Sequence, residues 1–137
     1  MHLSQIISLA ALSTAVSAIT VSFDPGYDDR GRSLNSVACS DGSNGLTRRG
    51  WKTQGDIPIF PYIGGAQAIA GWNSPECGSC WKLDYDGRSI KVLAIDHTDA
   101  GFNIAEAAMN ALTDGLARQV GRVDAQATKL TPKDCGL

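Results

Sequence analysis

Residues 77–97 read CGSCWKLDYDGRSIKVLAIDH, and this stretch predicts the centre of the fold. Apolar and polar side chains alternate from Trp81 to Tyr85 and again from Ser89 to Ile95, as in strands with one buried face. The Asp86-Gly87 pair between the two runs is typical of a tight hairpin turn. We therefore predict two antiparallel strands joined by that turn.

Short strands are expected in the rest of the chain as well. Val21 and Phe23 alternate with polar residues near one end, and Val123, Ala125 and Ala127 do so near the other. The 15 glycines favour many tight turns over long helices, and a hydrophobic content of 43% is enough for a core. The expected fold class is a small, mostly β barrel or sandwich.

One helix is expected after the hairpin. Asn103 and Glu106 have the spacing of a helix capping box, and apolar residues then recur at helical intervals as far as Leu112. A Thr-Asp-Gly turn ends this pattern, and a shorter helix is predicted from Leu116 to Val120.

The N-terminal segment has the pattern of a secretory signal. It is apolar from Ile6 to Val16, and small residues precede a predicted cleavage point after Ala18. The apolar run is too short to span a bilayer. We therefore predict a signal peptide at residues 1–18, one domain at residues 19–137, no membrane span and an extracellular protein.

The charge of the chain argues against two classes of partner. It carries 12 basic and 14 acidic side chains, which gives a net charge of −2. Without a basic excess, neither nucleic acid nor an anionic membrane would be captured by electrostatic attraction.

Four cysteines are present, namely Cys39, Cys77, Cys80 and Cys135. In an oxidising compartment an even number of cysteines indicates disulfides. The Cys77/Cys80 spacing also occurs in thioredoxin-like redox motifs, but here a strand follows where those motifs need a helix. A zinc site of four thiolates would need two close pairs. Bridges Cys39–Cys77 and Cys80–Cys135 would each remove about 4 kcal/mol of unfolded-state entropy, and spacing alone leaves the crossed pairing open.

Aromatic and polar side chains gather between residues 27 and 81, and such a set suits a polysaccharide. Sugar faces stack on aromatic rings, while sugar hydroxyls pair with amides and carboxylates. Most of the rings are expected in the core, Trp81 among them, whereas Tyr27, Trp51 and Tyr62 lie in turn-rich stretches and are the better surface candidates. The other members of the set are Phe60, Trp72, Asp41, Ser43, Asn44, Asp56, Gln67 and Asn73.

Two segments supply the candidate binding residues. The polar loop Ser40–Gly45 follows Cys39, and its tight turns would present Ser40, Asp41 and Asn44 in a fixed geometry. Asp96 ends the apolar strand of the hairpin, where a carboxylate either contacts a ligand or accepts local hydrogen bonds. His97 follows it, but no Ser or Cys lies in a recognisable nucleophile motif, so acyl transfer has little support.

Ten short motifs are spread over nearly the whole chain from Val21 onward. They are VSFD at 21–24, Tyr27-Asp28, RSL at 32–34, CSDGSNGL at 39–46, FPYIGG at 60–65, CGSCWKL at 77–83, IDH at 95–97, GFNI at 101–104, GRV at 121–123 and CGL at 135–137. In this order and spacing they resemble the cerato-platanin family of small secreted fungal proteins. Phe23 stands where the family often has Tyr.

The resemblance implies a six-stranded double-psi β-barrel with short flanking helices, similar to the first domain of expansins. It also implies the Cys39–Cys77 and Cys80–Cys135 pairing. It further implies binding of chitin oligomers, loosening of cellulosic material without clear hydrolysis, action in the fungal cell wall, and perception by plants as a defence elicitor. A plant cell-surface receptor is then a candidate partner. Self-assembly at interfaces is known for some members, and Asp96 matches the family acid that is similar to the expansin carboxylate.

Binding is expected in preference to hydrolysis. Cleavage of a glycosidic bond normally takes two carboxylates at a fixed separation, and Asp96 supplies one. Its possible partners Asp41, Asp56 and Asp99 lie in turn-rich stretches at distances that the sequence does not give. We expect a non-catalytic carbohydrate-binding protein without a cofactor or metal ion. The alternatives are a weak glycoside hydrolase, or a surface-active wall protein whose role does not depend on glycan binding.

Overall fold

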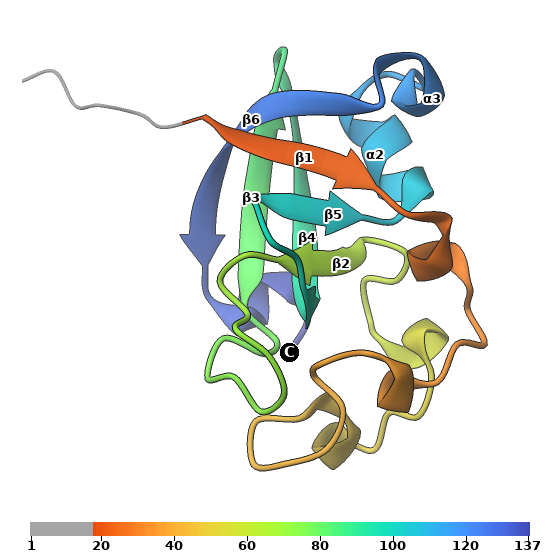
Figure 1. The fold of residues 1–137 in the computed structure, drawn as a ribbon, viewed down its shortest axis with the longest axis vertical. Helices are drawn as coiled ribbons and strands as arrows, with labels where there is room; N and C mark the ends of the chain where they lie inside the picture. Colours follow the sequence, from red (N-terminus) through yellow and green to blue (C-terminus); the bar gives the residue numbers. More distant parts are fainter. Residues whose placement is uncertain (1–17) are drawn as a thin grey trace, which may run out of the picture.

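The computed structural model describes residues 18–137, which form a closed six-stranded barrel with a loop-rich half beside it (Figure 1). The predicted signal peptide lies outside the described residues, except for Ala18. The strands are β1 (Ile19–Phe23), β2 (Ile63–Ala66), β3 (Cys80–Tyr85), β4 (Arg88–His97), β5 (Phe102–Ile104) and β6 (Arg122–Leu130). The helices are α2 (Glu106–Leu112) and α3 (Ala117–Val120), with 3₁₀ turns η1 (Pro25–Asp28), η2 (Leu34–Ser36), η3 (Leu46–Arg49), η4 (Gln54–Asp56) and η5 (Pro132–Cys135).

The strand order around the barrel is β1-β5-β2-β4-β3-β6. The pairs β1–β5 and β2–β4 are parallel, and the other four are antiparallel. Closure leaves no sheet edge with unpaired backbone groups. The barrel, its short flanking helices and the mostly β class confirm the double-psi barrel that the resemblance implies.

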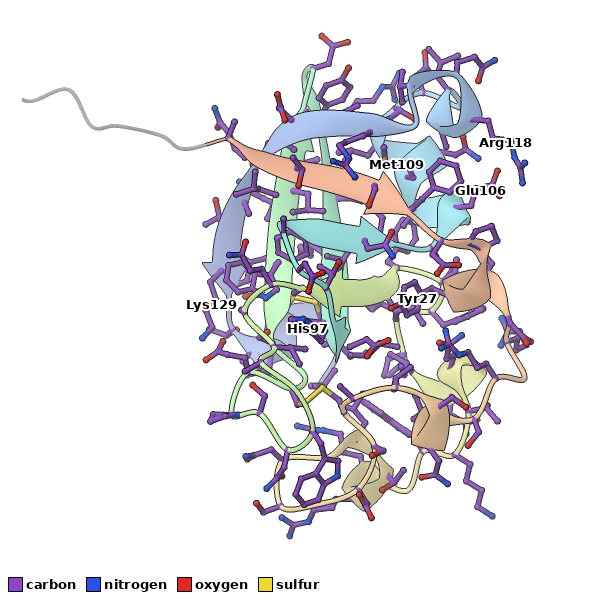
Figure 2. All side chains as sticks on the ribbon, viewed as in Figure 1. Tyr27, His97, Glu106, Met109, Arg118 and Lys129 are labelled. Carbon is purple, nitrogen blue, oxygen red and sulfur yellow. A yellow bond between two sulfur atoms is a disulfide. The ribbon has the colours of Figure 1, made fainter. Side chains whose placement is uncertain are left out.

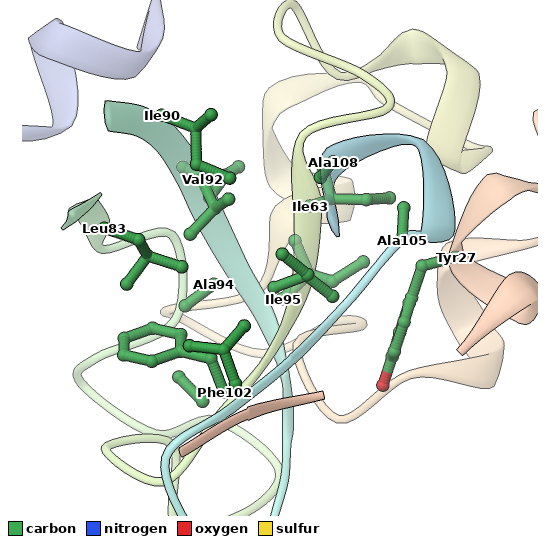
Figure 3. Close-up of a cluster of buried hydrophobic side chains, with 14 of the residues drawn as sticks. Tyr27, Ile63, Leu83, Ile90, Val92, Ala94, Ile95, Phe102, Ala105 and Ala108 are labelled. Atoms are coloured by element: carbon green, nitrogen blue, oxygen red, sulfur yellow. The ribbon is translucent and has the colours of Figure 1, made fainter. Parts of the chain in front are cut away.

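The β3–β4 hairpin forms as predicted. Tyr85 pairs with Arg88 across the turn, and Asp86 and Gly87 have φ values of 48° and 78°. Two successive residues with positive φ are what a two-residue hairpin turn of the right twist requires. Leu83, Ile90 and Val92 enter the barrel core (Figure 3). The predicted alternation ends there, because Val92, Leu93, Ala94 and Ile95 are all buried.

The capping box predicted at Asn103 is wrong. Asn103 lies in β5, where its side-chain oxygen accepts a hydrogen bond of 3.0 Å from the Ser22 hydroxyl. The helix begins at Glu106, and its first N–H groups donate instead to the carboxylate of Asp28, at 2.7 Å from Glu106 and 2.9 Å from Ala107. Asp28, far away in the sequence, thus supplies the cap. Residues 102–104 cannot take part in the helix because they are extended as strand β5 of the closed barrel.

The two disulfides follow the implied pairing. Cys39 joins Cys77 with a Cα–Cα distance of 5.5 Å, and Cys80 joins Cys135 at 5.7 Å. All four cysteines are therefore paired. Among residues 18–137, no helix has both the length and the apolar character needed to cross a bilayer.

Candidate functional site

Asp96 lies at the end of β4, where three internal hydrogen bonds hold its half-buried carboxylate. One oxygen accepts from the backbone N–H of Ala38 at 2.9 Å and of His97 at 3.0 Å. The other accepts from the hydroxyl of Tyr27 at 2.8 Å. Asp96 is therefore a hydrogen-bond acceptor whose carboxylate is fixed in place. It would have this position whether or not it also contacts a ligand.

Tyr27 does not lie on the surface, contrary to the expectation from its turn-rich segment. The side chain is 4% exposed, and its ring lies beside Ala105 with the hydroxyl pointing away from the helical end of the barrel (Figure 3). Asp24 caps η1 by accepting from the Gly26 N–H at 2.8 Å, and this turn directs Tyr27 inward. Burial, and then the hydrogen bond to Asp96, raise the pKa of Tyr27 well above its usual value.

The raised pKa of Tyr27 predicts a loss of stability in alkali. Above about pH 10, the usual pKa of tyrosine, the unfolded chain releases a proton that the folded chain keeps. The free energy of unfolding is therefore expected to fall as the pH rises from there toward the folded-state pKa. Urea unfolding of the wild type and Tyr27→Phe across this range measures the effect. The variant should lack this fall, and equal pH slopes for both proteins would contradict the prediction.

The end of β4 also anchors two loops, residues 38–45 and 67–79. The first is bound through the Ala38 contact to Asp96 and through the Cys39 N–H, which donates to the Ile95 carbonyl at 3.1 Å. The second is bound through His97, whose Nδ1 lies 2.6 Å from the Ile69 carbonyl. That carbonyl, and then Asp99 at 3.1 Å from Nε2, raise the pKa of His97. Tyr27 and His97 lie at the same, central level of the molecule (Figure 2).

The tips of these loops are joined by a set of contacts that we call the loop-tip cluster, made of Asp41, Asn44, Trp72 and Asn73. The Trp72 indole N–H donates to the Asp41 carboxylate at 2.6 Å. The backbone N–H of Asn44 donates to the Asn73 side-chain oxygen at 2.8 Å, and the Asn44 amide donates to the Asn73 carbonyl at 3.0 Å. The Cys39–Cys77 bridge links the same two loops.

A glycine makes the first loop tight enough for these contacts. A Cβ atom at Gly45 would lie 2.1 Å from the Asp41 carbonyl oxygen, closer than any side chain tolerates. Gly45 therefore permits the turn that presents Asp41. Ser40 lies at the base of this turn, with its hydroxyl 3.4 Å from the Asp41 carboxylate.

The structure thus brings together Ser40, Asp41 and Asn44, and it adds Trp72 as the residue that sequence reasoning missed. Trp72 is 62% exposed, more than any other large hydrophobic side chain among the described residues. A sequence signal was present, because Trp72 lies in the turn-rich stretch GWNSP at 71–75, but it was not selected with the other surface candidates.

Two other predicted site residues lie elsewhere. Trp51 is half-buried beside a hollow of about 480 Å³ that Ser33, Asn35, Thr47, Gly50 and Lys52 also line. Tyr62 is partly buried next to β2, and its carbonyl accepts from the Leu93 N–H at 3.0 Å. Within the residues that the structure describes, neither Trp51 nor Tyr62 shares a hydrogen bond with Asp96 or with the loop-tip cluster.

The three carboxylates considered as catalytic partners of Asp96 have other contacts. Asp41 binds Trp72, and Asp99 binds His97. Asp56 accepts from the N–H groups of Lys52 and Thr53 in the capping box of η4, and these bonds lower the pKa of Asp56. In the described part of the chain, none of the three shares a hydrogen bond with Asp96.

The fold and this region define a small, disulfide-bonded double-psi barrel protein with a rigid polar and aromatic surface at one end. The family model described as Cerato-platanin matches residues 19–137. The chain belongs to the cerato-platanin family.

Known relatives agree with this assignment. The chain is 50% identical to "Allergen Asp f 15" of Aspergillus fumigatus over 117 residues, which cover 85% of this chain and 76% of the allergen. The crystal structure of cerato-platanin 2 from M. perniciosa has a TM-score of 0.85 and 45% identity, covering 88% of this chain and 100% of the other. The solution structure of the fungal elicitor cerato-platanin has a TM-score of 0.77 and 38% identity, with coverages of 85% and 95%.

Proposed function

We propose that this is a secreted, non-hydrolytic protein that binds chitin-type N-acetylglucosamine oligomers at Asp96 and the loop-tip cluster. The observation that carries the proposal is the exposed indole of Trp72, which Asp41 holds in place at the tips of the two loops that Asp96 and His97 anchor. As in expansins, binding would loosen glycan packing, in the fungal wall or in cellulosic material, without cleaving a chain.

The loop-tip cluster has the chemistry that sugar binding needs. An exposed indole offers an apolar face for a pyranose ring, while the neighbouring amide of Asn44, the Ser43 hydroxyl and the Asp41 carboxylate can pair with hydroxyl and acetamido groups. The hydrogen bond to Asp41 fixes the orientation of Trp72 before any ligand arrives. Binding would therefore cost little side-chain entropy.

The absence of cleavage in this proposal rests on the arrangement of carboxylates. A retaining or inverting glycosidase needs a protonated acid and a second carboxylate facing it across the bond. Here Asp96 is held as a hydrogen-bond acceptor by Tyr27 and Ala38, and Asp41 is held by Trp72. A weak hydrolase remains the alternative that a sensitive assay for new reducing ends would reveal.

Surface activity is a second candidate function, favoured by a different observation. Leu116 and Val120 lie next to or on α3 and are 45% and 37% exposed, at the opposite end of the barrel from the loops (Figure 1). A protein with exposed apolar side chains at both ends can adsorb and self-assemble at an air–water interface. One relative is described as a fungal elicitor. Action as an elicitor through a plant cell-surface receptor would be compatible with either function.

The role of Trp72 predicts weaker glycan binding when its ring is removed. Trp72→Ala should bind N-acetylglucosamine hexamers about fivefold more weakly than wild type, since aromatic stacking is worth about 1 kcal/mol. Residue-by-residue NMR titration measures the affinity and should place the largest shifts at the loop-tip cluster and Asp96. Cellulose oligomers, titrated in parallel, would show which glycan is preferred.

Leu116→Ala is the matched control for this experiment. It also removes an exposed apolar side chain, but at the other end of the molecule. It should keep wild-type affinity for the hexamer and reduce surface activity instead. Wild-type affinity in Trp72→Ala would contradict the proposed site.

A further inference from the structure

We propose that residues 48–52, Arg48-Arg49-Gly50-Trp51-Lys52, form a second ligand site that binds the carboxylates of an acidic polysaccharide. The ligand class is a polyuronate, a sugar chain with one carboxylate on each ring. This segment adjoins the loop-tip cluster through Arg48 and Ser43, but it would recognise carboxylates, which chitin lacks.

Three exposed cations stand within these five residues, although the whole chain is slightly acidic. Within residues 18–137, none of the three forms an ion pair with a carboxylate. Some exposed cations elsewhere have such partners, as Arg118 does with Glu106 at 2.6 Å (Figure 2) and Lys129 with Glu76 at 2.7 Å. No other five-residue segment of residues 18–137 carries three cations without an ion pair. The unpaired cations of residues 48–52 are thus available to an anionic ligand.

The carboxylate next to this segment, Asp56, does not neutralise it directly. One of its oxygens accepts from the backbone N–H groups of Lys52 and Thr53, and this geometry fixes the turn of η4. The Lys52 ammonium remains exposed beside the segment. The charge of Asp56 weakens the attraction for a single anion, whereas three neighbouring cations can pair with several carboxylates of one ligand, which favours a polyanion.

The local backbone sets the directions of the two arginines. Gly50 ends η3 with φ +86°, and the Arg49 guanidinium lies 5.6 Å from the centre of the Trp51 ring. The Arg48 Nη1 donates to the Ser43 carbonyl at 2.7 Å, which directs that side chain toward the loop-tip cluster. Stacking and hydrogen bonding reduce the freedom of both guanidinium groups before a ligand binds.

Two hollows flank this segment and provide hydroxyl and amide groups beside the cations. One, of about 480 Å³, is lined by Ser33, Asn35, Thr47, Gly50, Trp51 and Lys52. The other, of about 310 Å³, lies against Arg48 and Arg49 and includes Ser43 and Asn44. A uronic acid ring needs both kinds of partner, because it carries hydroxyls and a carboxylate.

These features favour an acidic glycan over a lipid surface. Membrane capture by basic residues is strengthened by exposed apolar side chains that insert among the lipids. In residues 48–52 the only aromatic ring is half-buried under Arg49. The mainly polar lining of the hollow beside Arg48 and Arg49 also serves a sugar and not an acyl chain.

Calorimetric titration with galacturonic acid oligomers tests the proposal. Wild type should bind them with an affinity that falls as salt is added. The triple variant Arg48→Gln/Arg49→Gln/Lys52→Gln should bind about tenfold more weakly, if each exposed charge contributes a modest amount. The double variant Arg49→Gln/Lys52→Gln, which leaves Arg48 on the Ser43 carbonyl, should keep wild-type affinity for N-acetylglucosamine hexamers, so failure of this site is distinguishable from failure of the proposed function.

The matched control is Lys91→Gln/Arg122→Gln/Lys133→Gln, which removes the same charge from exposed positions elsewhere. It should bind galacturonic acid oligomers within about twofold of wild type. An equal loss in both triple variants, or no binding by wild type, would overturn the proposal. Residues 48–52 would instead be a lipid site if vesicles with phosphatidylserine bound wild type and the uronic acid oligomers did not. Thermal melting confirms that each variant is folded.

Discussion

Replacing Cys80 and Cys135 by alanine is expected to lower the free energy of unfolding by about 4 kcal/mol. The bridge closes a sequence separation of 55 residues, so its loss restores a large number of conformations to the unfolded chain. It also ties the start of β3 to the C-terminal turn η5, and both sulfur atoms are buried. For a domain of this size the midpoint of thermal unfolding should fall by about 15 °C.

The Cys39→Ala/Cys77→Ala variant is the matched comparison. Its bridge spans 38 residues, so the predicted loss is again about 4 kcal/mol. This bridge, however, joins the two loops of the candidate site. The first variant should keep the NMR contacts of the loop-tip cluster below its melting temperature, whereas the second should lose them. Losses below about 1 kcal/mol in both variants would show that the bridges do not constrain the unfolded chain as the loop model requires.

Short sequence patterns predicted the elements of the fold that depend on residues adjacent in the sequence, namely turns and half-buried strands. The Asp86-Gly87 turn carries its own requirement for positive φ, and the alternating residues on either side need one buried face. Strand β6 was predicted for the same reason, since Val123 and Ala125 are buried and their neighbours exposed. Local patterns did not distinguish a barrel from a sandwich, because that depends on parallel pairs such as β1–β5, which join strands about 80 residues apart.

The helix start shows where local reasoning fails. Asn103 and Glu106 satisfy the capping-box pattern, but the barrel needs residues 102–104 as a strand between β1 and β2. Tertiary pairing overrides the local preference, and Asp28 supplies the cap across the fold. Glu106 is then free to bind Arg118, with two hydrogen bonds of 2.6 and 2.8 Å between α2 and α3.

The candidate site was predicted only in part, because some of its residues are positioned by contacts that are distant in the sequence. The Ser40–Gly45 loop could be recognised because its turns are local, and Asp96 because a buried strand ends there. The positions of Tyr27 and Trp72 depend on distant partners. Asp96, 69 residues after Tyr27, accepts the hydroxyl that the η1 turn directs inward, and Asp41, 31 residues before Trp72, fixes the orientation of its exposed indole.

Replacing Asp96 by alanine is expected to destabilise the protein by about 3 kcal/mol. The change leaves the buried hydroxyl of Tyr27 and the N–H of Ala38 without their acceptor. Each unsatisfied buried group costs about 1–3 kcal/mol. Urea unfolding of the single and double variants measures this directly. Adding Tyr27→Phe to Asp96→Ala should recover about 1 kcal/mol, since it removes one orphaned group.

A loss of glycan binding in Asp96→Ala would therefore not prove that Asp96 touches the sugar, because the loop after Ala38 would also lose its anchor. Asp96→Asn separates the two roles. Its side-chain oxygen can still accept from the Ala38 N–H, and the Tyr27 hydroxyl can turn to accept from the new amide. This variant should stay within about 1 kcal/mol of wild-type stability. If it also bound N-acetylglucosamine hexamers as tightly as wild type, the charge of Asp96 would serve only the scaffold, whereas weaker binding with intact stability would assign the carboxylate to the ligand.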